Sequence, residues 1–425
     1  MIAVGSTVMA SVRRATATDR LAHLDIIRGA TILWVTIFHF YVDTRGVSVL
    51  GAGPEGFLSA AGHGNVIAAI GVAARALVGI PGYRLHVFLL LSGLVLSLGR
   101  PVPAAEFFKR RARAILPNYW LGSLAAFLLV AALAELRAAL VGGGFLAQLK
   151  GGTLLAGAPY RFEWPDLLRS AAILGRFENA RAMQAVAPSL WYVVLVGQLY
   201  VAFPLLRGTL RRLGPWWFLA TAAALTWGGR AFAFQHLVVP GFDPVQTVNC
   251  FLPFRLLPAA AGMVVALEAD RLGFQPRGPM LWLLSPLAVA CLVGAAWLSL
   301  DVNTPGTRLA LVGGIVPLVV SFPALWALAL LAAAGHLPRT VLTWAGRNSL
   351  SVLVAQDFLR VGVGTLLALR GHLADLTWAL MPLYLGLALG LAWVWHRLPR
   401  AVGARIWPPS SIKAAGLEPQ GSRGS

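Results

Sequence analysis

Charged side chains are scarce in this sequence. Asp, Glu, Lys and Arg make up 12% of the 425 residues, whereas hydrophobic residues make up 58%. A water-soluble domain has about a quarter of its residues charged, so this chain has too little polar side chain to cover a water-facing surface. Acidic residues are the scarcest, with 16 Asp and Glu against 35 Lys and Arg. The composition excludes a soluble globular domain and indicates a polytopic membrane protein.

Cysteine and the common catalytic signatures are also missing. The two cysteines, Cys250 and Cys291, lie in apolar segments and form neither a disulfide framework nor a metal-ligand pattern. The sequence has no Walker A loop, no GxGxxG, no HExxH and no GxSxG nucleophile elbow. We therefore expect no bound metal and no permanently bound cofactor.

The strongly basic balance, a net charge of +19, could suggest a nucleic-acid partner. The arginines, however, form short clusters between apolar segments, which is typical of the loops that set membrane topology. We therefore expect a lipid bilayer and no nucleic acid as partner. The excess of 32 Arg over 3 Lys, in a chain rich in Ala, Leu and Gly, is typical of a GC-rich bacterial genome.

The apolar segments predict an all-α membrane protein with about ten transmembrane helices. Each segment is long enough, or nearly so, to cross a bilayer as a helix. A further segment, 57–80, contains polar residues and is either an eleventh span or an interfacial or re-entrant helix. The ten predicted spans are approximately 26–44, 84–99, 115–136, 189–206, 215–235, 249–268, 280–299, 309–334, 341–365 and 376–396.

The distribution of Lys and Arg predicts the orientation of these spans. More of them fall in the tails and loops that share a side with the N-terminus, so both termini are expected in the cytoplasm. The predicted layout is a cytoplasmic tail 1–23, a transmembrane domain 24–398 with an outer loop at about 137–188, and a disordered cytoplasmic tail 399–425. The expected location is the cell membrane, with multiple passes.

The first predicted span, "LDIIRGATILWVTIFHFY", contains Arg28 and His39. Eleven residues are close to three helical turns, so both side chains project from nearly the same face, roughly 16 Å apart along the axis. Ionisable groups at this depth usually face the bundle interior or a water-filled cavity. A snorkelling arginine and a hydrogen-bonded core histidine are the alternative for either residue alone, but their shared face favours a functional pair.

A basic cluster, "KRRAR", follows the second predicted span. Such a cluster is ordinary positive-inside charge. Its functional interpretation is a phosphate clamp, because guanidinium groups pair with phosphates through two parallel hydrogen bonds.

Several stretches, in order and spacing, resemble the integral-membrane acyltransferase family 3, the acyltransferase-3 domain. Arg28 and His39 are similar to the R-x10-H motif of that family, and Arg110 to Arg113 resemble its cytoplasmic RxxR motif. Other similar stretches are "LDIIRG", "FLLLSGLVLS", "RAILPNYW", "SLWYVVLVGQLYVAFPLL", "FRLLPAAAGMVVAL" and "GRNSLSVLVAQ". The sequence departs from the family pattern at Val196, where many members have glutamate, and at Gln356, where histidine is usual.

The resemblance implies transfer of an acyl group, commonly acetyl, from cytoplasmic acyl-CoA to a hydroxyl of a sugar or glycan-type acceptor, as in polysaccharide O-acetylation. His39 would be the general base, or would form a transient acyl-imidazole, with Arg28 as its catalytic partner. Acyl-CoA would be a co-substrate. The residues expected to hold it are Arg110, Arg111, Arg113 and Ser92.

The acceptor is expected to contact Trp191, Tyr200, Gln198 and Asp25. An aromatic belt is the alternative role for the two rings, and a helix cap or an ion pair with Arg28 is the alternative for the carboxylate. His86 is either a second acid or base or plain interface polarity. A transporter or flippase that moves a glycan without chemistry, and a structural membrane subunit, remain alternatives. The sequence names neither the acceptor nor the oligomeric state.

Overall fold

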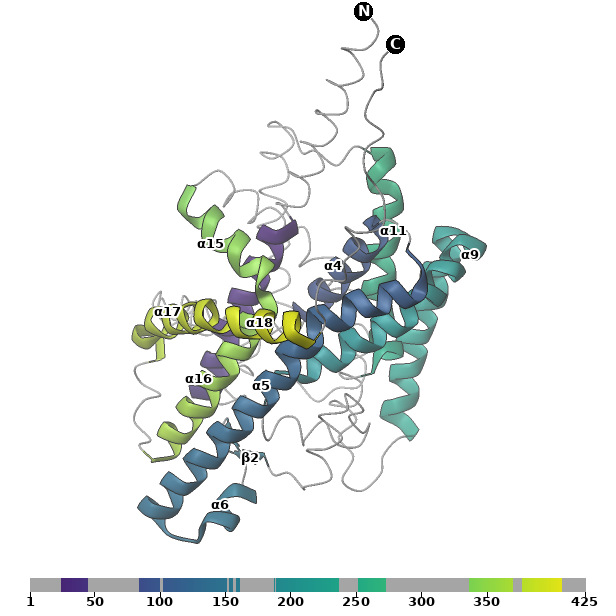
Figure 1. Ribbon diagram of the computed structural model, residues 1–425. Coiled ribbons are helices and arrows are strands. Elements are labelled where there is room, and N and C mark those ends of the chain that lie inside the picture. The colour runs from purple at the N-terminus through teal and green to yellow at the C-terminus, as the bar shows by residue number, and fades with distance from the viewer. Residues whose placement is uncertain are drawn as a thin grey trace, which may run out of the picture.

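The computed structural model describes residues 24–44, 84–99, 102–150, 153–155, 158–160, 187, 189–236, 251–272, 336–369 and 377–406. These residues are nearly all helical (Figure 1). The chain order is an N-terminal helix Leu24–Thr44, α4 (Arg84–Leu98), α5 (Ala104–Val141), α6 (Phe145–Lys150), β1 (Thr153–Leu155), β2 (Ala158–Tyr160), α9 (Trp191–His236), η3 (Leu252–Arg255), α11 (Leu256–Leu272), α15 (His336–Arg347), α16 (Ser349–Leu369), α17 (Thr377–Trp395) and α18 (Arg397–Ile406).

Four stretches in the described part of the chain are long and apolar enough to cross a membrane: Leu24–Thr44, Ala104–Val141, Trp191–Phe232 and Ala379–Gly403. His86–Leu98 and Leu252–Leu267 are shorter apolar helices. The prediction of a helical membrane protein is therefore confirmed, whereas the count of about ten spans stays a prediction. Segments 57–80, 280–299 and 309–334 lie outside the described residues.

The longest helix, α5, has two apolar faces of different side-chain size. One face is buried and includes the small residues Gly122, Ala126 and Ala134. The other face exposes large apolar residues such as Leu124 and Leu128, each more than half exposed. Small residues at helix contacts and large apolar residues facing outward are typical of helices surrounded by lipid. The buried face packs on α16, where the Val354 side chain lies over Gly122.

Helix α9 consists of two helical halves that are interrupted at Gly214, where φ is 75° and ψ is 171°. Gln198 accepts a hydrogen bond from the Leu252 N–H, and the Thr226 hydroxyl accepts one from the Leu257 N–H. In one straight helix, Gln198 and Thr226 would lie about 42 Å apart along the axis. Both contact the same short segment, so the two halves turn back on each other. This agrees with two separate apolar segments, 189–206 and 215–235.

Three features differ from the sequence predictions. The helix that was predicted over 115–136 begins earlier and ends later, at Ala104 and Val141. The predicted outer loop contains a small antiparallel hairpin, in which Thr153 pairs with Tyr160. The tail after residue 398 is helical as far as Ile406, so its predicted disorder is wrong for those residues. Helix α18 packs against α5, where Gly403 contacts Pro117, and this packing explains the last difference.

Two pairs of helices approach each other closely through glycine. A Cβ atom at Gly29 would overlap the backbone oxygen of Leu342, and one at Gly346 would overlap the backbone oxygen of Asp25. The N-terminal helix and α15 therefore contact each other backbone to backbone. Helices α4 and α11 do the same, through Gly93 and Gly262. Glycine permits this because it has no side chain to hold the helices apart.

We predict that Gly346→Ala destabilises the protein, because the added methyl group would separate the N-terminal helix from α15. Overpacking of this kind costs about 1–3 kcal/mol. Thermal unfolding of the purified protein in detergent measures the effect. Gly386→Ala in α17 is the matched control, since no atom lies within 4 Å of a Cβ there. An equal unfolding temperature for both variants would contradict the close contact.

Candidate active site

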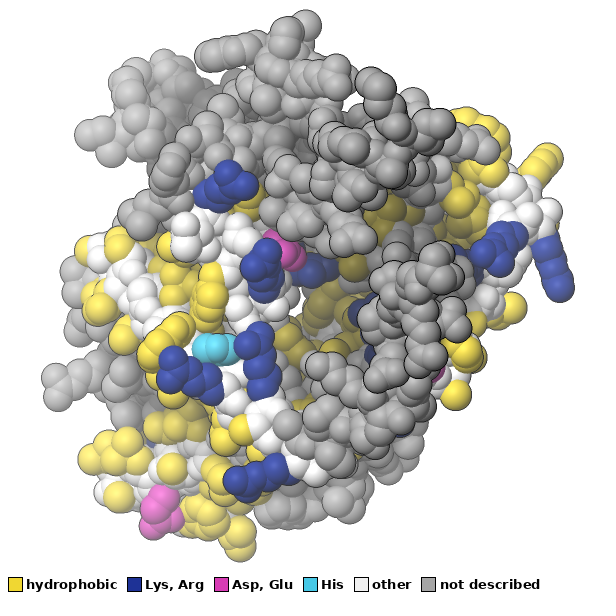
Figure 2. Space-filling view, turned by 45° about the horizontal axis from the view of Figure 1, so that its top comes forward, with side chains coloured by type: hydrophobic (Ala, Val, Ile, Leu, Met, Phe, Trp, Pro, Cys, Tyr) yellow, Lys and Arg dark blue, Asp and Glu magenta, His cyan; other side chains and the backbone are white. Residues whose placement is uncertain are grey.

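One cavity of about 1040 Å³ is bordered by the N-terminal helix and by α4, α5, α9, α15, α16 and α18. Figure 2 shows a hollow on one face of the molecule, with Lys and Arg side chains around it and hydrophobic side chains within it. Segments that are far apart in the sequence therefore meet around a single space. The described helices form the walls of the cavity, and the side chains that each helix contributes determine its chemistry.

The N-terminal helix contributes a continuous stripe to this cavity. Arg28, Ile32, Val35 and His39 all border it, and their spacing of four, three and four residues places them on one helical face. The stripe is polar at both ends and apolar in the middle. Because the rise is 1.5 Å per residue, the cavity extends roughly 16 Å along this helix. Arg28 and His39 thus face one space, as the sequence predicted.

Six arginines border the cavity, and no aspartate or glutamate is among the described residues that do so. The six are Arg28, Arg111, Arg113, Arg255, Arg347 and Arg400. A concave surface of one charge sign attracts ligands of the opposite sign. The electrostatics of this cavity therefore favour a ligand that carries several negative charges.

Contacts between helix ends bring several of these arginines together at the Arg28 end. The Arg347 side chain bonds the Asp25 carboxylate at 2.9 Å, and Arg28 lies 3.9 Å from the same carboxylate. Arg400 of α18 donates to the Asn348 side chain at 2.9 Å. Asp25 pairs with two arginines of the cavity but does not border it. Of the roles predicted for Asp25, the geometry supports the ion pair with Arg28.

The basic cluster of α5 divides between two faces of the helix. Arg111 and Arg113 border the cavity and are half-buried. The Arg111 guanidinium lies 5.4 Å from the centre of the Tyr200 ring, a cation–π contact. Arg110 instead is exposed and pairs with Glu106 at 2.7 Å. Of the three arginines that the resemblance assigns to the donor, the structure brings two to the cavity.

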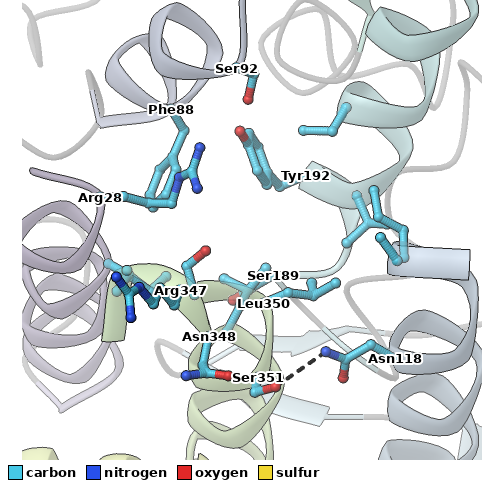
Figure 3. A pocket seen from close by; sticks show the side chains of 18 of the residues that line it. Arg28, Phe88, Ser92, Asn118, Ser189, Tyr192, Arg347, Asn348, Leu350 and Ser351 are labelled. Carbon is cyan, nitrogen blue, oxygen red and sulfur yellow. Dashed lines mark hydrogen bonds between the residues drawn. The ribbon is translucent and has the colours of Figure 1, made fainter. Parts of the chain in front are cut away.

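The wall formed by α4 and α9 is polar at Ser92 and otherwise combines aromatic and aliphatic side chains. Figure 3 shows Arg28 and Tyr192 projecting into the space between the helices, with the Tyr192 hydroxyl directed toward Ser92. Ser92, Trp191 and Tyr200, all predicted site residues, border the cavity. Gln198 does not border it, because it faces η3 from another side of α9.

His86 and Arg255 form a buried pair between α4 and η3. The Arg255 guanidinium lies 3.2 Å from His86 Nε2. Arginine has donors only, so His86 Nε2 accepts and the neutral ring carries its proton on Nδ1. His86 is thus occupied by Arg255 and does not border the cavity. Of its two predicted roles, the geometry favours a local polar contact over an acid or base.

Beyond His39, a buried polar cluster joins the N-terminal helix, α16 and the segment before α9. Arg360 bonds both oxygens of Asp43, at 2.6 and 3.0 Å, and bonds the Ser189 hydroxyl at 3.0 Å. The Asp357 carboxylate accepts the Ser189 N–H at 2.9 and 3.1 Å. All four residues are less than 10% exposed, and Ser189 borders the cavity. Sequence reasoning missed Asp43, Ser189 and Arg360, although Asp43 and Arg360 are charged residues near the ends of apolar segments.

Fold and site together define a class: a helical membrane protein whose cationic cavity passes from an arginine-rich end to a histidine. The acyltransferase domain family, acyltransferase 3, matches residues 21–397. The match covers most of the chain, so the protein belongs to this family and is a membrane acyltransferase. No curated protein and no solved structure matches the chain.

We predict that loss of the buried Asp43–Arg360 ion pair lowers the unfolding temperature, whereas loss of the exposed Glu106–Arg110 pair does not. Asp43→Asn removes the carboxylate that bonds the buried Arg360 and leaves it only Asp357, at 3.7 Å; loss of a partner in a buried ion pair costs about 3–5 kcal/mol. Glu106→Gln removes the exposed carboxylate that pairs with Arg110 and should leave the unfolding temperature unchanged. Thermal unfolding in detergent compares the two variants. Equal unfolding temperatures would show that Arg360 does not depend on Asp43.

Proposed function

We propose that the protein transfers an acyl group, acetyl in the simplest case, from acyl-CoA to a hydroxyl of a sugar or glycan-type acceptor. One observation carries the proposal: a single cavity joins an arginine-rich end to His39 along one face of the N-terminal helix. The family supplies the reaction type. The residues of the cavity supply the donor-binding site and the base.

Coenzyme A suits this cavity in charge and in length. Its phosphates would pair with arginines at the Arg28 end, where no carboxylate among the described residues borders the cavity. Its uncharged pantetheine arm would pass the apolar middle of the stripe, along Ile32 and Val35. The roughly 16 Å from Arg28 to His39 is comparable to the length of that arm. The thioester would then lie beside His39.

His39 is the general base in this proposal. An acceptor hydroxyl is a poor nucleophile at neutral pH, and imidazole is the side chain best suited to take its proton. The hydroxyl oxygen forms a bond to the thioester carbon while its proton passes to His39. The carbon–sulfur bond then breaks, and the CoA thiolate takes up the proton. Arg28 pairs with the donor at the other end of the stripe and orients it.

The orientation in the membrane follows from the same proposal. Acyl-CoA is a cytoplasmic molecule, so the end with Arg28, Arg347 and Arg400 would open to the cytoplasm. Both termini would then lie in the cytoplasm, in agreement with the Lys and Arg bias of the sequence. The cell membrane is the corresponding location.

We predict that Arg111→Ala and Arg113→Ala each weaken binding of acetyl-CoA. Loss of one charge-assisted hydrogen bond costs about 1.5–3 kcal/mol, which is about a tenfold to hundredfold increase in Kd. Titration of the purified protein with acetyl-CoA measures it. Arg212→Ala is the control, because Arg212 is exposed and does not border the cavity. If all three variants bind acetyl-CoA equally, the cluster serves topology alone. Arg110→Ala should bind like this control.

We predict that His39→Gln loses transfer by about 10²–10⁴-fold, the usual contribution of a positioned base. Glutamine keeps a similar size and can form hydrogen bonds, but it does not take a proton at neutral pH. Release of CoA thiol from acetyl-CoA, with a panel of glycosides as acceptors, measures the rate. The Kd for acetyl-CoA should stay the same, because the base acts in the transition state. Near-normal transfer by His39→Gln would exclude His39 as the base.

Arg28→Lys extends that experiment to the other end of the stripe. Lysine keeps the charge but loses the planar fork, so donor binding and transfer should both be impaired. Thr36→Val in the same helix is the matched control: Thr36 is buried and bonds its own helix at Ile32 O. A wild-type protein that neither binds nor cleaves acetyl-CoA would exclude the proposed donor.

A further inference from the structure

Ser189 has an unusual arrangement of hydrogen bonds at the border of the cavity. Its Oγ accepts one hydrogen bond from Arg360 at 3.0 Å and one from the Gln356 side chain at 3.2 Å. Its backbone N–H donates to Asp357. The residue is 3% exposed. Side chain and backbone are thus held from two directions by α16.

These contacts determine what the Ser189 hydroxyl can still do. A serine hydroxyl has two acceptor positions and one donor, and Arg360 and Gln356 occupy both acceptor positions. Among the described residues, no acceptor receives the Ser189 hydroxyl hydrogen. Because Ser189 borders the cavity, its remaining donor is available to a molecule bound there. Figure 3 draws Ser189 in the same space as Arg28 and Tyr192.

Ser189 and His39 border the same cavity, and the cluster connects the two residues through Asp43 and Arg360. Asp43 follows His39 by four residues, so their Cβ atoms lie about 5–6 Å apart on one helical face. Arg360 links Asp43 directly to Ser189. A ligand in the cavity that both residues border can contact His39 and Ser189, and the buried guanidinium behind the serine makes its hydroxyl a stronger donor toward negative charge.

We infer that Ser189 is a catalytic residue that donates a hydrogen bond to the carbonyl oxygen of the acyl group; this rests on the proposed function. When the acceptor oxygen bonds the carbonyl carbon, its proton goes to His39. The carbonyl electron pair moves onto the carbonyl oxygen, which becomes an oxyanion bonded by the Ser189 hydroxyl. The oxygen–carbon double bond then re-forms, the carbon–sulfur bond breaks, and CoA leaves with the proton from His39. Arg360 and Gln356 are positioning residues.

An acyl-serine intermediate is the rival role for this residue, and the geometry opposes it. A nucleophilic serine needs a free lone pair and a base that takes its proton. Both acceptor positions of Ser189 are engaged by nitrogen donors, and no base among the described residues accepts its hydrogen. A hydroxyl that can only donate a hydrogen bond is better suited to bind an oxyanion than to act as a nucleophile.

The direct test is the infrared spectrum of acetyl-CoA, labelled with ¹³C at the carbonyl, bound to the wild-type protein without acceptor. A hydrogen bond from Ser189 lowers the carbonyl stretching frequency relative to acetyl-CoA in an apolar solvent. In Ser189→Ala the frequency should rise again. The rate of transfer should fall by about 10²–10³-fold, as is typical when one oxyanion donor is removed, with Kd for acetyl-CoA unchanged. Ser189→Thr, which keeps the hydroxyl, should retain most of the rate.

The controls separate this inference from the proposed function and from folding. Thr36→Val, a buried hydroxyl away from the cavity, should keep both rate and frequency. An active wild-type protein without a lowered frequency would overturn the role of Ser189, and this measurement needs no variant to fold. An active Ser189→Ala protein, or acetyl found covalently on Ser189 by mass spectrometry, would overturn it too. A wild-type protein that neither binds nor cleaves acetyl-CoA would instead overturn the proposed function.

Discussion

An arginine side chain inside an apolar helix bundle cannot lose its charge at an acceptable energy, so it needs either a buried acid or a water-accessible space. The structure uses both solutions. Arg360 has two carboxylates nearby, with Asp43 bonded and Asp357 at 3.7 Å. Arg111 and Arg113 instead border the cavity, without a carboxylate among the described lining residues, and Arg28 borders it while lying 3.9 Å from Asp25. The position of the cavity follows from this constraint, because it lies where the arginines of several helices meet.

Close helix contacts determine which residues meet there. The backbone contact between the N-terminal helix and α15, at Gly29 and Gly346, fixes the rotation of the first helix. That rotation aims the stripe of Arg28, Ile32, Val35 and His39 at the cavity and places Arg347 beside Asp25. Side chains larger than glycine would overlap the facing backbone and force the two helices apart. The same helix contacts thus determine both the packing of the helices and the alignment of the polar groups.

Local sequence spacing predicted the parts of the site that belong to one helix. Arg28 and His39 face one cavity because helical periodicity requires it. Which of Arg110 and Arg111 borders the cavity depends on the rotation of α5, and the sequence alone did not predict that rotation. Neighbouring helical residues point about 100° apart. The same holds for Gln198 on α9. The cluster around Ser189 joins Asp43 to Arg360, more than three hundred residues later, and tertiary packing alone creates such a pair. The hairpin at Thr153–Tyr160 was missed because its strands are only three residues long.

The apolar middle of the cavity has a physical role between its two polar ends. Ile32 and Val35 lie on the stripe, and Phe88, Val193 and Val196 border the same space. In the proposed reaction, hydration of the donor phosphates would be useful at the arginine end, because water screens and exchanges them. Beside His39, water would be a competing nucleophile, and its exclusion would also strengthen each electrostatic contact. An uncharged pantetheine arm that lies in an apolar passage would allow hydrated phosphates at one end and a dry site beside His39 at the other. A carboxylate such as glutamate at Val196 would hydrate that passage. The valine at this position therefore favours a dry passage between the proposed donor phosphates and the proposed base.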